Sequence, residues 1–322
     1  MTTRKRPELK PLFIDRMQKI LPEKEDYENY LKILKSEPVK SIRCNTLKIS
    51  PEKLKARLEK KNWKIKQPFP EHPEIFIIES QLEPGELGRS LEHQLGYYYV
   101  QEIASMLPIL ALQPEKNQLI LDLCASPGSK TTQLAAKMQN TGTIIANEVS
   151  FGRMKILSTN LERCGVTNTI ITRQDGVALC KKLKKEGMRF DKILVDAPCS
   201  GEGTLRSSLK TYVMWNIKTV KNLPKIQKNL LASAIEILKP QGEIIYSTCT
   251  HAPEENESVV NEILEKFPEI KIEKVNLPIK CRPGMKEWEN EKFLQEINSA
   301  CRIYPHDANT EGFFIAKLKN GN

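Results

Sequence analysis

Two cysteines occupy positions in the sequence where a thiol could act as a nucleophile. Cys199 lies in DAPCSG, three residues after Asp196, and Cys249 lies in YSTCT; each segment follows a run rich in Ile, Leu and Val. A single cysteine more often packs as a small hydrophobic residue, which we expect of Cys164 and Cys180. Two cysteines that each follow a buried strand, one of them beside an acid, instead predict thiol chemistry in an electropositive pocket.

Three acids also follow apolar segments in succession. Asp122 ends QLILD, Glu148 ends GTIIANE and Asp175 ends NTIITRQD. In a parallel sheet, ligands bind beyond the carboxyl ends of the strands, where Glu148 suits a ribose diol and Asp175 an adenine amino group. After Asp122 comes a turn whose small residues let backbone N–H groups approach an anionic group at a helix start, and it comprises Cys124, Ala125, Ser126, Pro127, Gly128, Ser129 and Lys130. These features predict an adenosyl ligand.

Two other kinds of nucleotide site are excluded by spacing. A phosphate loop needs GxxxxGK[ST], but Leu123 stands at its first glycine and Ser129 separates Gly128 from Lys130. The dinucleotide fingerprint GxGxxG is absent. Because no loop is suited to a pyrophosphate, S-adenosyl-L-methionine fits better than a nicotinamide cofactor.

Metal sites and disulfides are not expected. The chain has eight cysteines, no two closer than 16 residues, and four scattered histidines. A structural zinc site usually shows a close cysteine pair, so we predict no metal. The N-terminus lacks the apolar segment of a secretory signal, so we also expect no disulfide framework and a cytoplasmic protein.

The elements that must position these residues follow two patterns. Residues 1–95 are expected to form a small α+β domain, with helices at 12–21, 27–35 and 52–60 and strands at 41–50, 63–66 and 74–79. Residues 97–112 are predicted to form one amphipathic helix. Strands and helices then alternate, which predicts an α/β domain over residues 96–322 with a doubly wound, mostly parallel sheet. Pro253 is expected to start a helix, and residues 275–300 to form an insertion.

The positive charge of the chain is concentrated at its start. The 322 residues carry a net charge of +10, and residues 1–66 hold 19 Lys+Arg against 9 Asp+Glu, so the remainder balances to zero. A solvated charged face is one interpretation; a nucleic-acid partner is the other. No apolar run approaches the roughly 18 residues that a membrane span needs. We therefore expect no membrane association, and no obligate protein partner is evident.

These segments together resemble the RNA (cytosine-5) methyltransferases of the Sun/Nop2/RsmB family. The resemblance runs from about Ile42 to Leu318 and is specific, because DAPCSG and STCT occur in the expected order. GEGTLR after DAPCSG most resembles members that act on tRNA, with some bacterial rRNA members similar. Ser126, Asn147 and residues 275–300 depart from the usual pattern, and the last bears on substrate choice rather than chemistry. The matching segments are IRCNTLKI, GYYYVQEIASML, LDLCASPGSKTTQLA, NEVSFGRMKIL, LVDAPCSGEGTLR, IYSTCTHAPEENESVV and RIYPHDANTEGFFIAKL.

The resemblance implies a Rossmann-like S-adenosylmethionine-dependent methyltransferase sheet and methyl transfer to carbon 5 of cytosine in RNA, with tRNA the expected substrate. Cys249 rather than Cys199 would be the nucleophile, a choice that spacing alone leaves open. Asp196 would hold the cytosine and Lys130 would position Asp196. The methyl donor would contact Cys124 to Lys130, Glu148, Arg153, Asp175 and Asp196. With RNA as the expected partner, the positive charge of residues 1–66 indicates that the N-terminal domain, residues 1–95, binds RNA, so deleting residues 1–66 should weaken RNA binding far more than methyl-donor binding.

Several alternatives remain open at this point. The same reaction on rRNA is the nearest, and a non-catalytic RNA-binding or assembly factor is another. An exocyclic amino-methyltransferase would need an aromatic residue where Cys199 stands. Arg302 is expected to make either an RNA contact or a structural salt bridge, and His251 could tune the pKa of Cys249. Trp63 and Trp215 are expected to pack in the core.

Overall fold

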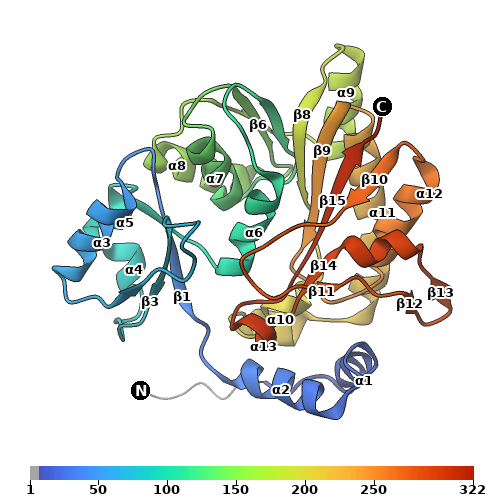
Figure 1. The fold of residues 1–322 in the computed structure, drawn as a ribbon, viewed down its shortest axis with the longest axis horizontal. Helices are drawn as coiled ribbons and strands as arrows, with labels where there is room; N and C mark the ends of the chain where they lie inside the picture. Colours follow the sequence, from blue (N-terminus) through green and yellow to red (C-terminus); the bar gives the residue numbers. More distant parts are fainter. Residues whose placement is uncertain (1–6) are drawn as a thin grey trace.

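The computed structural model describes residues 7–322, which form a small sheet, a large sheet and the helices around them (Figure 1). The small sheet is antiparallel, and its strands lie in the order β2-β3-β1-β4. These strands are β1 (Lys40–Cys44), β2 (Ile65–Lys66), β3 (Ile75–Ile78) and β4 (Tyr98–Val100). The accompanying helices are α3 (Pro51–Glu59), α4 (Glu86–Arg89) and α5 (Leu91–Gln94).

The large sheet contains the parallel segment that the sequence predicts. Its strands are β5 (Leu119–Asp122), β6 (Thr143–Asn147), β7 (Thr169–Thr172), β8 (Phe190–Asp196), β9 (Leu238–Thr248), β10 (Ile270–Glu273), β11 (Arg282–Pro283), β14 (Cys301–Ile303) and β15 (Phe313–Asn320). They lie in the order β11-β14-β15-β9-β8-β5-β6-β7, with β10 paired to β15. From β9 to β7 every pairing is parallel, whereas β15, β14, β11 and β10 are antiparallel. The predicted doubly wound sheet is confirmed, but the sheet is mixed rather than mostly parallel, with four parallel and four antiparallel strand pairings.

Helices cover both faces of the large sheet (Figure 1). One face carries α6 (Ile103–Leu112), α7 (Ser129–Lys137) and α8 (Phe151–Cys164); the other carries α9 (Gly176–Lys185), α11 (Ile217–Ile235) and α12 (Glu257–Lys266). Alternate strand residues pack on opposite faces, as Ile120 and Leu121 do in two separate hydrophobic clusters. Near-continuous apolar strands follow from this two-sided burial. The shorter elements are η1 (Glu202–Thr204), α10 (Leu209–Met214), β12 (Glu287–Trp288), β13 (Glu291–Lys292), η2 (Gln295–Ser299) and α13 (Pro305–Ala308).

The first two helices do not pack on the small sheet, although they belong to the segment predicted as one domain, residues 1–95. Helices α1 (Pro11–Ile20) and α2 (Lys24–Lys35) lie beside α10 and α13, apart from α3 (Figure 1). Phe13 and Tyr30 belong to the core of the large sheet, and Phe13 meets Trp215 edge-on at 5.3 Å. The apolar periodicity of α1 and α2 predicts that one face of each helix is buried, but it does not identify the surface against which that face packs.

The segment 97–112 is not one amphipathic helix. Tyr98–Val100 pairs with β1, because aromatic and β-branched residues favour an extended strand in that sheet. Helix α6 starts only at Ile103, and all of its residues except Ser105 are buried. A helix enclosed by other elements has no polar face to show.

The helix expected from Pro253 begins instead at Glu257. Residues 253–256 form turns, since Asn256 accepts a hydrogen bond from Thr248 Oγ1 at 2.6 Å and Glu255 accepts one from the Ser200 N–H at 3.0 Å. The side chains of Asn256 and Glu255 thus accept hydrogen bonds from the end of β9 and from the loop after β8, and they do not lie in the first turn of a helix.

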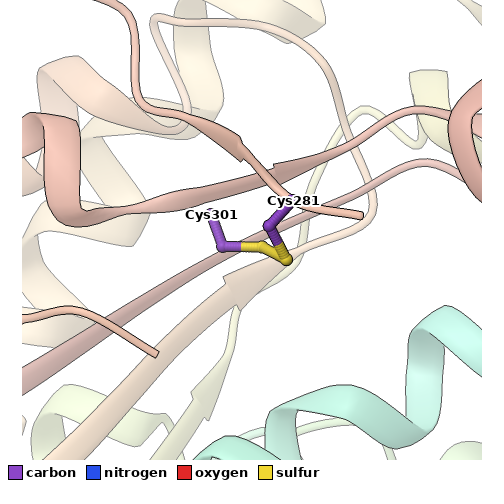
Figure 2. Close-up of a disulfide and its surroundings, with 2 residues drawn as sticks. All are labelled: Cys281 and Cys301. Atoms are coloured by element: carbon purple, nitrogen blue, oxygen red, sulfur yellow. A yellow bond between two sulfur atoms is a disulfide. The ribbon is translucent and has the colours of Figure 1, made fainter. Parts of the chain in front are cut away.

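Residues 275–300 extend one edge of the large sheet and contain half of a disulfide. Cys281 is bonded to Cys301 (Figure 2), so the expectation of no disulfide is wrong for this pair. The reason is the pairing of β11 with β14, which places the two Cα atoms 5.3 Å apart although 20 residues separate them. The other six cysteines are free thiols.

Over residues 7–322, the helices are all too short or too polar to cross a membrane.

Candidate active site

The two cysteines meet at the carboxyl ends of neighbouring parallel strands. Asp196 and Ser247 are paired in the register of β8 and β9, and the chain beyond each strand turns into the same space. The sulfur atoms of Cys199 and Cys249 lie 3.0 Å apart, and the Cys249 N–H donates to the sulfur of Cys199 at 3.3 Å. The structure thus brings together the two thiols that the sequence singled out.

Cys199 is held as a neutral thiol. Its hydrogen bond with Cys249, followed by burial, raises the pKa of Cys199 well above its ordinary value. Burial also raises the pKa of Glu255, to about 7, and its Oε2 accepts hydrogen bonds from the Ser200 N–H and from Gln227 Nε2. Gln227 also donates to the Pro198 carbonyl at 2.9 Å, which fixes the loop that carries Cys199.

Gly203 brings that loop against the second cysteine. Its N–H donates to the Cys249 carbonyl at 2.9 Å, and a Cβ on this residue would lie 2.2 Å from the Gly312 carbonyl oxygen. No side chain fits there without moving the backbone. Gly203, Glu255 and Gln227 were missed by the sequence analysis; only the GEGT and PEEN segments signalled the first two.

Asp196 lies between a cation and a hydroxyl. Lys130 Nζ donates to Asp196 Oδ2 at 2.8 Å, and Ser247 Oγ donates to Oδ1 at 2.8 Å. The ammonium also donates to Ser105 Oγ at 3.0 Å and lies 5.3 Å from the ring centre of Phe313. Lys130 is buried, so its position relative to the carboxylate is fixed by these contacts rather than by solvent.

The loop after β5 has the shape of a ligand cradle. Gly128 has a φ of +99°, and a Cβ there would lie 3.0 Å from Leu157 Cδ1. A cavity of about 200 Å³ is lined by Ser105, Asp122, Cys124, Ala125, Ser126, Pro127, Ser129, Lys130 and Asp196. Asp122 Oδ1 is buried without a hydrogen-bond partner among the described residues, while Thr131 Oγ1 donates to Oδ2 at 2.7 Å. Burial raises the pKa of Asp122 to about 7 and that of Cys124 above its ordinary value. This cradle fits the predicted methyl donor.

The remaining predicted cofactor residues border the loop in different ways. Arg153 donates to the Ser126 carbonyl at 2.7 Å and lies 3.5 Å from the carboxylate of Glu148, which is buried. Asp175 is exposed and caps α9 by accepting from the Ala178 N–H at 3.0 Å. Glu148 and Asp175 follow β6 and β7 at the same edge of the sheet, but neither lines the 200 Å³ cavity.

A larger cavity of about 1100 Å³ adjoins the first, and Ser105, Lys130 and Asp196 line both. Besides α6 and α7, which carry Ser105 and Lys130, its walls include the segment after α2, the small sheet, the ends of β8 and β9, the segment from η1 to α10 and the start of β15. Cys249 lines this cavity, whereas Cys199 does not. The lining carries four basic residues, Lys35, Lys40, Lys130 and Arg206, and four acidic ones, Glu37, Glu102, Asp196 and Glu311. A ligand in this cavity would reach Cys249 rather than Cys199.

Four residues that the sequence left open have structural contacts. Trp63 and Trp215 are each 5% exposed, as expected of packing residues. Arg302 pairs with Glu257 inside the protein at 2.6 Å. Burial, with the nearby charge of Arg302, lowers the pKa of His251 to about 3, so its ring is neutral and stacks on Tyr304 at 5.0 Å between centroids.

Comparison with known proteins places these features in context. Residues 109–319 match the family model described as 16S rRNA methyltransferase RsmB/F, and residues 9–103 match the N-terminal domain of 16S rRNA methyltransferase RsmF. A ribosomal RNA small subunit methyltransferase F from Psychromonas ingrahamii is 41% identical over 95% of this chain and 62% of its own length. A tRNA (cytosine(49)-C(5))-methyltransferase from Pyrococcus abyssi is 40% identical over 87% of both chains.

A solved structure shares the whole architecture. The methyltransferase homolog protein from Pyrococcus horikoshii is 32% identical, with a TM-score of 0.77 over 97% of this chain and 100% of that one. The Rossmann-like methyltransferase fold with an N-terminal domain is therefore confirmed. The chain spans less than two thirds of the length of the first curated relatives it matches, 62% and 63%.

Proposed function

The chain belongs to the RsmB/F family of RNA methyltransferases, as its motifs indicated, and we propose that it transfers a methyl group from S-adenosyl-L-methionine to carbon 5 of cytosine in RNA. The observation that carries this proposal is the pair of thiols 3.0 Å apart, of which only Cys249 lines the large cavity. A non-catalytic RNA-binding factor has no need of two thiols at the ends of adjacent strands. The proposed setting is the cytoplasm.

Cys249 is the proposed nucleophile. Its thiolate adds to carbon 6 of cytosine, which breaks the aromaticity of the ring and makes carbon 5 electron-rich. S-adenosyl-L-methionine, when bound, supplies the electrophilic methyl group that carbon 5 accepts. The carbon 5 proton then leaves, the bond between Cys249 and carbon 6 breaks, and the thiolate is restored.

Cys199, Asp196 and Lys130 are proposed to assist proton removal and to position the base. Cys199 lies 3.0 Å from the nucleophile, and its proposed role is to assist removal of the carbon 5 proton. Because its raised pKa keeps Cys199 protonated at rest, it must first give its own proton to solvent before it can accept the one from carbon 5. Asp196 holds the exocyclic amine and ring nitrogen of the base, and Lys130 keeps that carboxylate in place through the contact at 2.8 Å. The target base must leave its stack to reach this site, at a cost of roughly a few kcal/mol.

The methyl donor is assigned to the loop Cys124–Lys130, together with Asp196 and the residues beyond β6 and β7. The unpartnered Oδ1 of Asp122 and the positive φ of Gly128 support this assignment. Glu148 is placed for the ribose, with Arg153 beside it, and Asp175 for the adenine.

The RNA is assigned to the large cavity between the two sheets. Lys35 and Lys40 are exposed on its wall, Lys130 also lines it, and Arg206 donates to the Glu37 carbonyl between the two lysines at 2.5 Å. Each phosphate contact contributes roughly 0.9 to the slope of log K against log salt on duplex nucleic acid, and somewhat less on single strands. The double variant Lys35→Ala/Lys40→Ala should therefore reduce the salt dependence of RNA binding without changing the Kd for S-adenosyl-L-methionine. An unchanged slope would remove these lysines from the RNA site.

The substrate class is proposed to be tRNA, with rRNA as the second candidate. The GEGTLR segment and the 40% identity to a tRNA enzyme support the first. The 41% identity to an rRNA enzyme supports the second. The two are separated by incubating the protein with total RNA and labelled methyl donor, then mapping new 5-methylcytosines by bisulfite sequencing. New sites confined to rRNA would refute the tRNA assignment, and no incorporation into any RNA would refute the proposed activity.

A further inference from the structure

An arginine of the small sheet reaches into the first turn of α7, behind the methyl-donor loop. Arg43 lies in β1, and its Nη1 donates to the Ser129 carbonyl at 2.8 Å while Nη2 donates to Thr132 Oγ1 at 2.7 Å. Ser129 is the first residue of α7 and lines the 200 Å³ cavity. Arg43 is 2% exposed, so it lies buried behind the wall of this cavity, in contact with Ser129.

A tyrosine on the adjacent strand holds the preceding part of the same loop. Tyr99 of β4 is the register partner of Arg43, and its ring centre lies 5.6 Å from the guanidinium carbon. The Tyr99 hydroxyl donates to the Pro127 carbonyl at 3.3 Å. Two paired residues of the small sheet therefore contact Pro127 and Ser129, on either side of Gly128.

Arg43 has no carboxylate as a direct ion-pair partner among residues 7–322; the carboxylate of Glu74 acts on it at longer range and is itself paired with Lys137 at 2.6 Å. Its acceptors are the carbonyl of Ser129, the hydroxyl of Thr132 and the side-chain amides of Gln101 and Gln133. Burial lowers the pKa of Arg43 to about 10, which leaves it charged at neutral pH. A buried cation at the N-terminal end of a helix favours an anionic group in front of that end.

We propose that Arg43 and Tyr99 are positioning residues for the methyl donor, so that the small sheet serves the cofactor as well as the RNA. Tyr99 holds the backbone of the loop, and Arg43 both holds Ser129 and favours the carboxylate of S-adenosyl-L-methionine. The identity of the ligand rests on the proposed function.

The test compares binding of two ligands, of which only one has a carboxylate. S-adenosyl-L-methionine carries it, whereas 5′-methylthioadenosine lacks the carboxylate together with the α-amino group, the chain that bears them and the positive charge on sulfur. Arg43→Gln should raise the Kd for S-adenosyl-L-methionine about tenfold by calorimetry, and that for 5′-methylthioadenosine at most about twofold. Equal losses for the two ligands, or no loss for either, would overturn the role of the charge.

Tyr99→Phe removes one oxygen and keeps the test open if Arg43→Gln does not fold. It should raise both Kd values about threefold, since the loop loses an anchor without losing a charge. Unchanged affinities would overturn the role of Tyr99.

Asn45 supplies the matched control. Asn45 is the residue directly after β1, two positions beyond Arg43. Its Nδ2 donates to the carbonyls of Gly96 and Cys164 at 2.8 and 2.7 Å rather than to the loop Cys124–Lys130. Asn45→Ala should lower the Tm but keep both Kd values within about twofold of the parent. If it weakens S-adenosyl-L-methionine as strongly as Arg43→Gln, a general loosening of the junction explains the data and the proposal fails. All these readouts are ligand affinities, so a chain that failed to methylate RNA would refute the proposed function and leave this comparison intact.

Discussion

Removing Arg302 should destabilise the protein strongly, because its partner is left charged inside the core. The side chains of Arg302 and Glu257 are 3% and 0% exposed. They form two parallel hydrogen bonds at 2.6 and 2.8 Å, and Arg302 also donates to the His251 carbonyl at 3.0 Å. Breaking a buried ion pair from one side costs about 3–5 kcal/mol. We therefore expect Arg302→Met to lower the free energy of unfolding by that amount, a large share of the roughly 5–15 kcal/mol that a native protein has.

A double variant separates the lost attraction from the stranded charge. In Arg302→Met/Glu257→Gln no charge remains buried, and the glutamine oxygen can still accept from the Met285 N–H, which lies 3.0 Å from Glu257 Oε1. Because replacing both members of a buried pair is far less costly than removing one, the double variant should recover at least about 2 kcal/mol. Urea unfolding followed by tryptophan fluorescence measures both changes as shifts in midpoint.

The same variants decide whether Arg302 contacts RNA. Since Arg302 is enclosed, its loss should leave the Kd for RNA unchanged under conditions where the variant is folded. An Arg302→Met protein with a wild-type urea midpoint and RNA binding weakened about tenfold would refute the structural role and restore the RNA contact.

Four other variants test three separate parts of the structure. Cys249→Ala should abolish both methylation and covalent RNA adducts, whereas Cys199→Ala should lose turnover yet accumulate an adduct on denaturing gels; the opposite pattern would exchange their roles. The pKa of His251 is lowered from 6.5 to about 3, so below pH 6.5 the unfolded chain binds a proton that the folded chain does not, and stability falls as the pH drops through that range. Between pH 7.5 and 5.0 the parent should lose about 2 kcal/mol more than His251→Phe in chemical unfolding, and equal losses would mean that the ring is protonated in the folded protein. The Cys281–Cys301 disulfide closes a loop of 20 residues, so a reducing agent should cost the parent about 3 kcal/mol and leave Cys281→Ala/Cys301→Ala unaffected. A parent indifferent to reductant would show that this bond adds no stability.

The features predicted best from the sequence are the residues at the carboxyl ends of adjacent parallel strands. Runs of Ile, Leu and Val give buried strands, and the order of a doubly wound sheet then brings their carboxyl ends to one edge. Asp196, Cys199 and Cys249 could be grouped on that basis alone. Their mutual distances could not, because the loop that carries Cys199 is fixed by Glu255 and Gln227 from other elements.

Contacts between segments far apart in the sequence could not be predicted, because the pattern of apolar residues in one segment does not identify the segment that it will contact. Arg43 and Ser129 are 86 residues apart, and nothing in IRCNTLKI says which helix the arginine will reach. Tyr98–Val100 continues without a break toward α6, so its apolar pattern predicts a helix, whereas the segment forms an edge strand of the small sheet. The pairing of Cys281 with Cys301 depends on a short strand, β11, that has no sequence signal of its own.

The concentration of positive charge in residues 1–66 acquires a different meaning once these contacts are known. The segment does not form one basic domain: α1 and α2 pack on the core of the large sheet, while β1 belongs to the small sheet. Lys35 ends α2 and Lys40 begins β1, so the two lysines flank the connection between these two parts of the chain. Both line the large cavity. Deleting residues 1–66 would thus remove core side chains such as Phe13 and Tyr30 and also the Arg43 contacts behind the methyl-donor loop. The charge distribution predicted that the deletion weakens RNA binding far more than methyl-donor binding. We now expect it to impair both, because the same stretch of chain contributes to the cavity wall, the core and the support of the cofactor site. Only substitutions at the exposed lysines can separate the phosphate contacts from the fold.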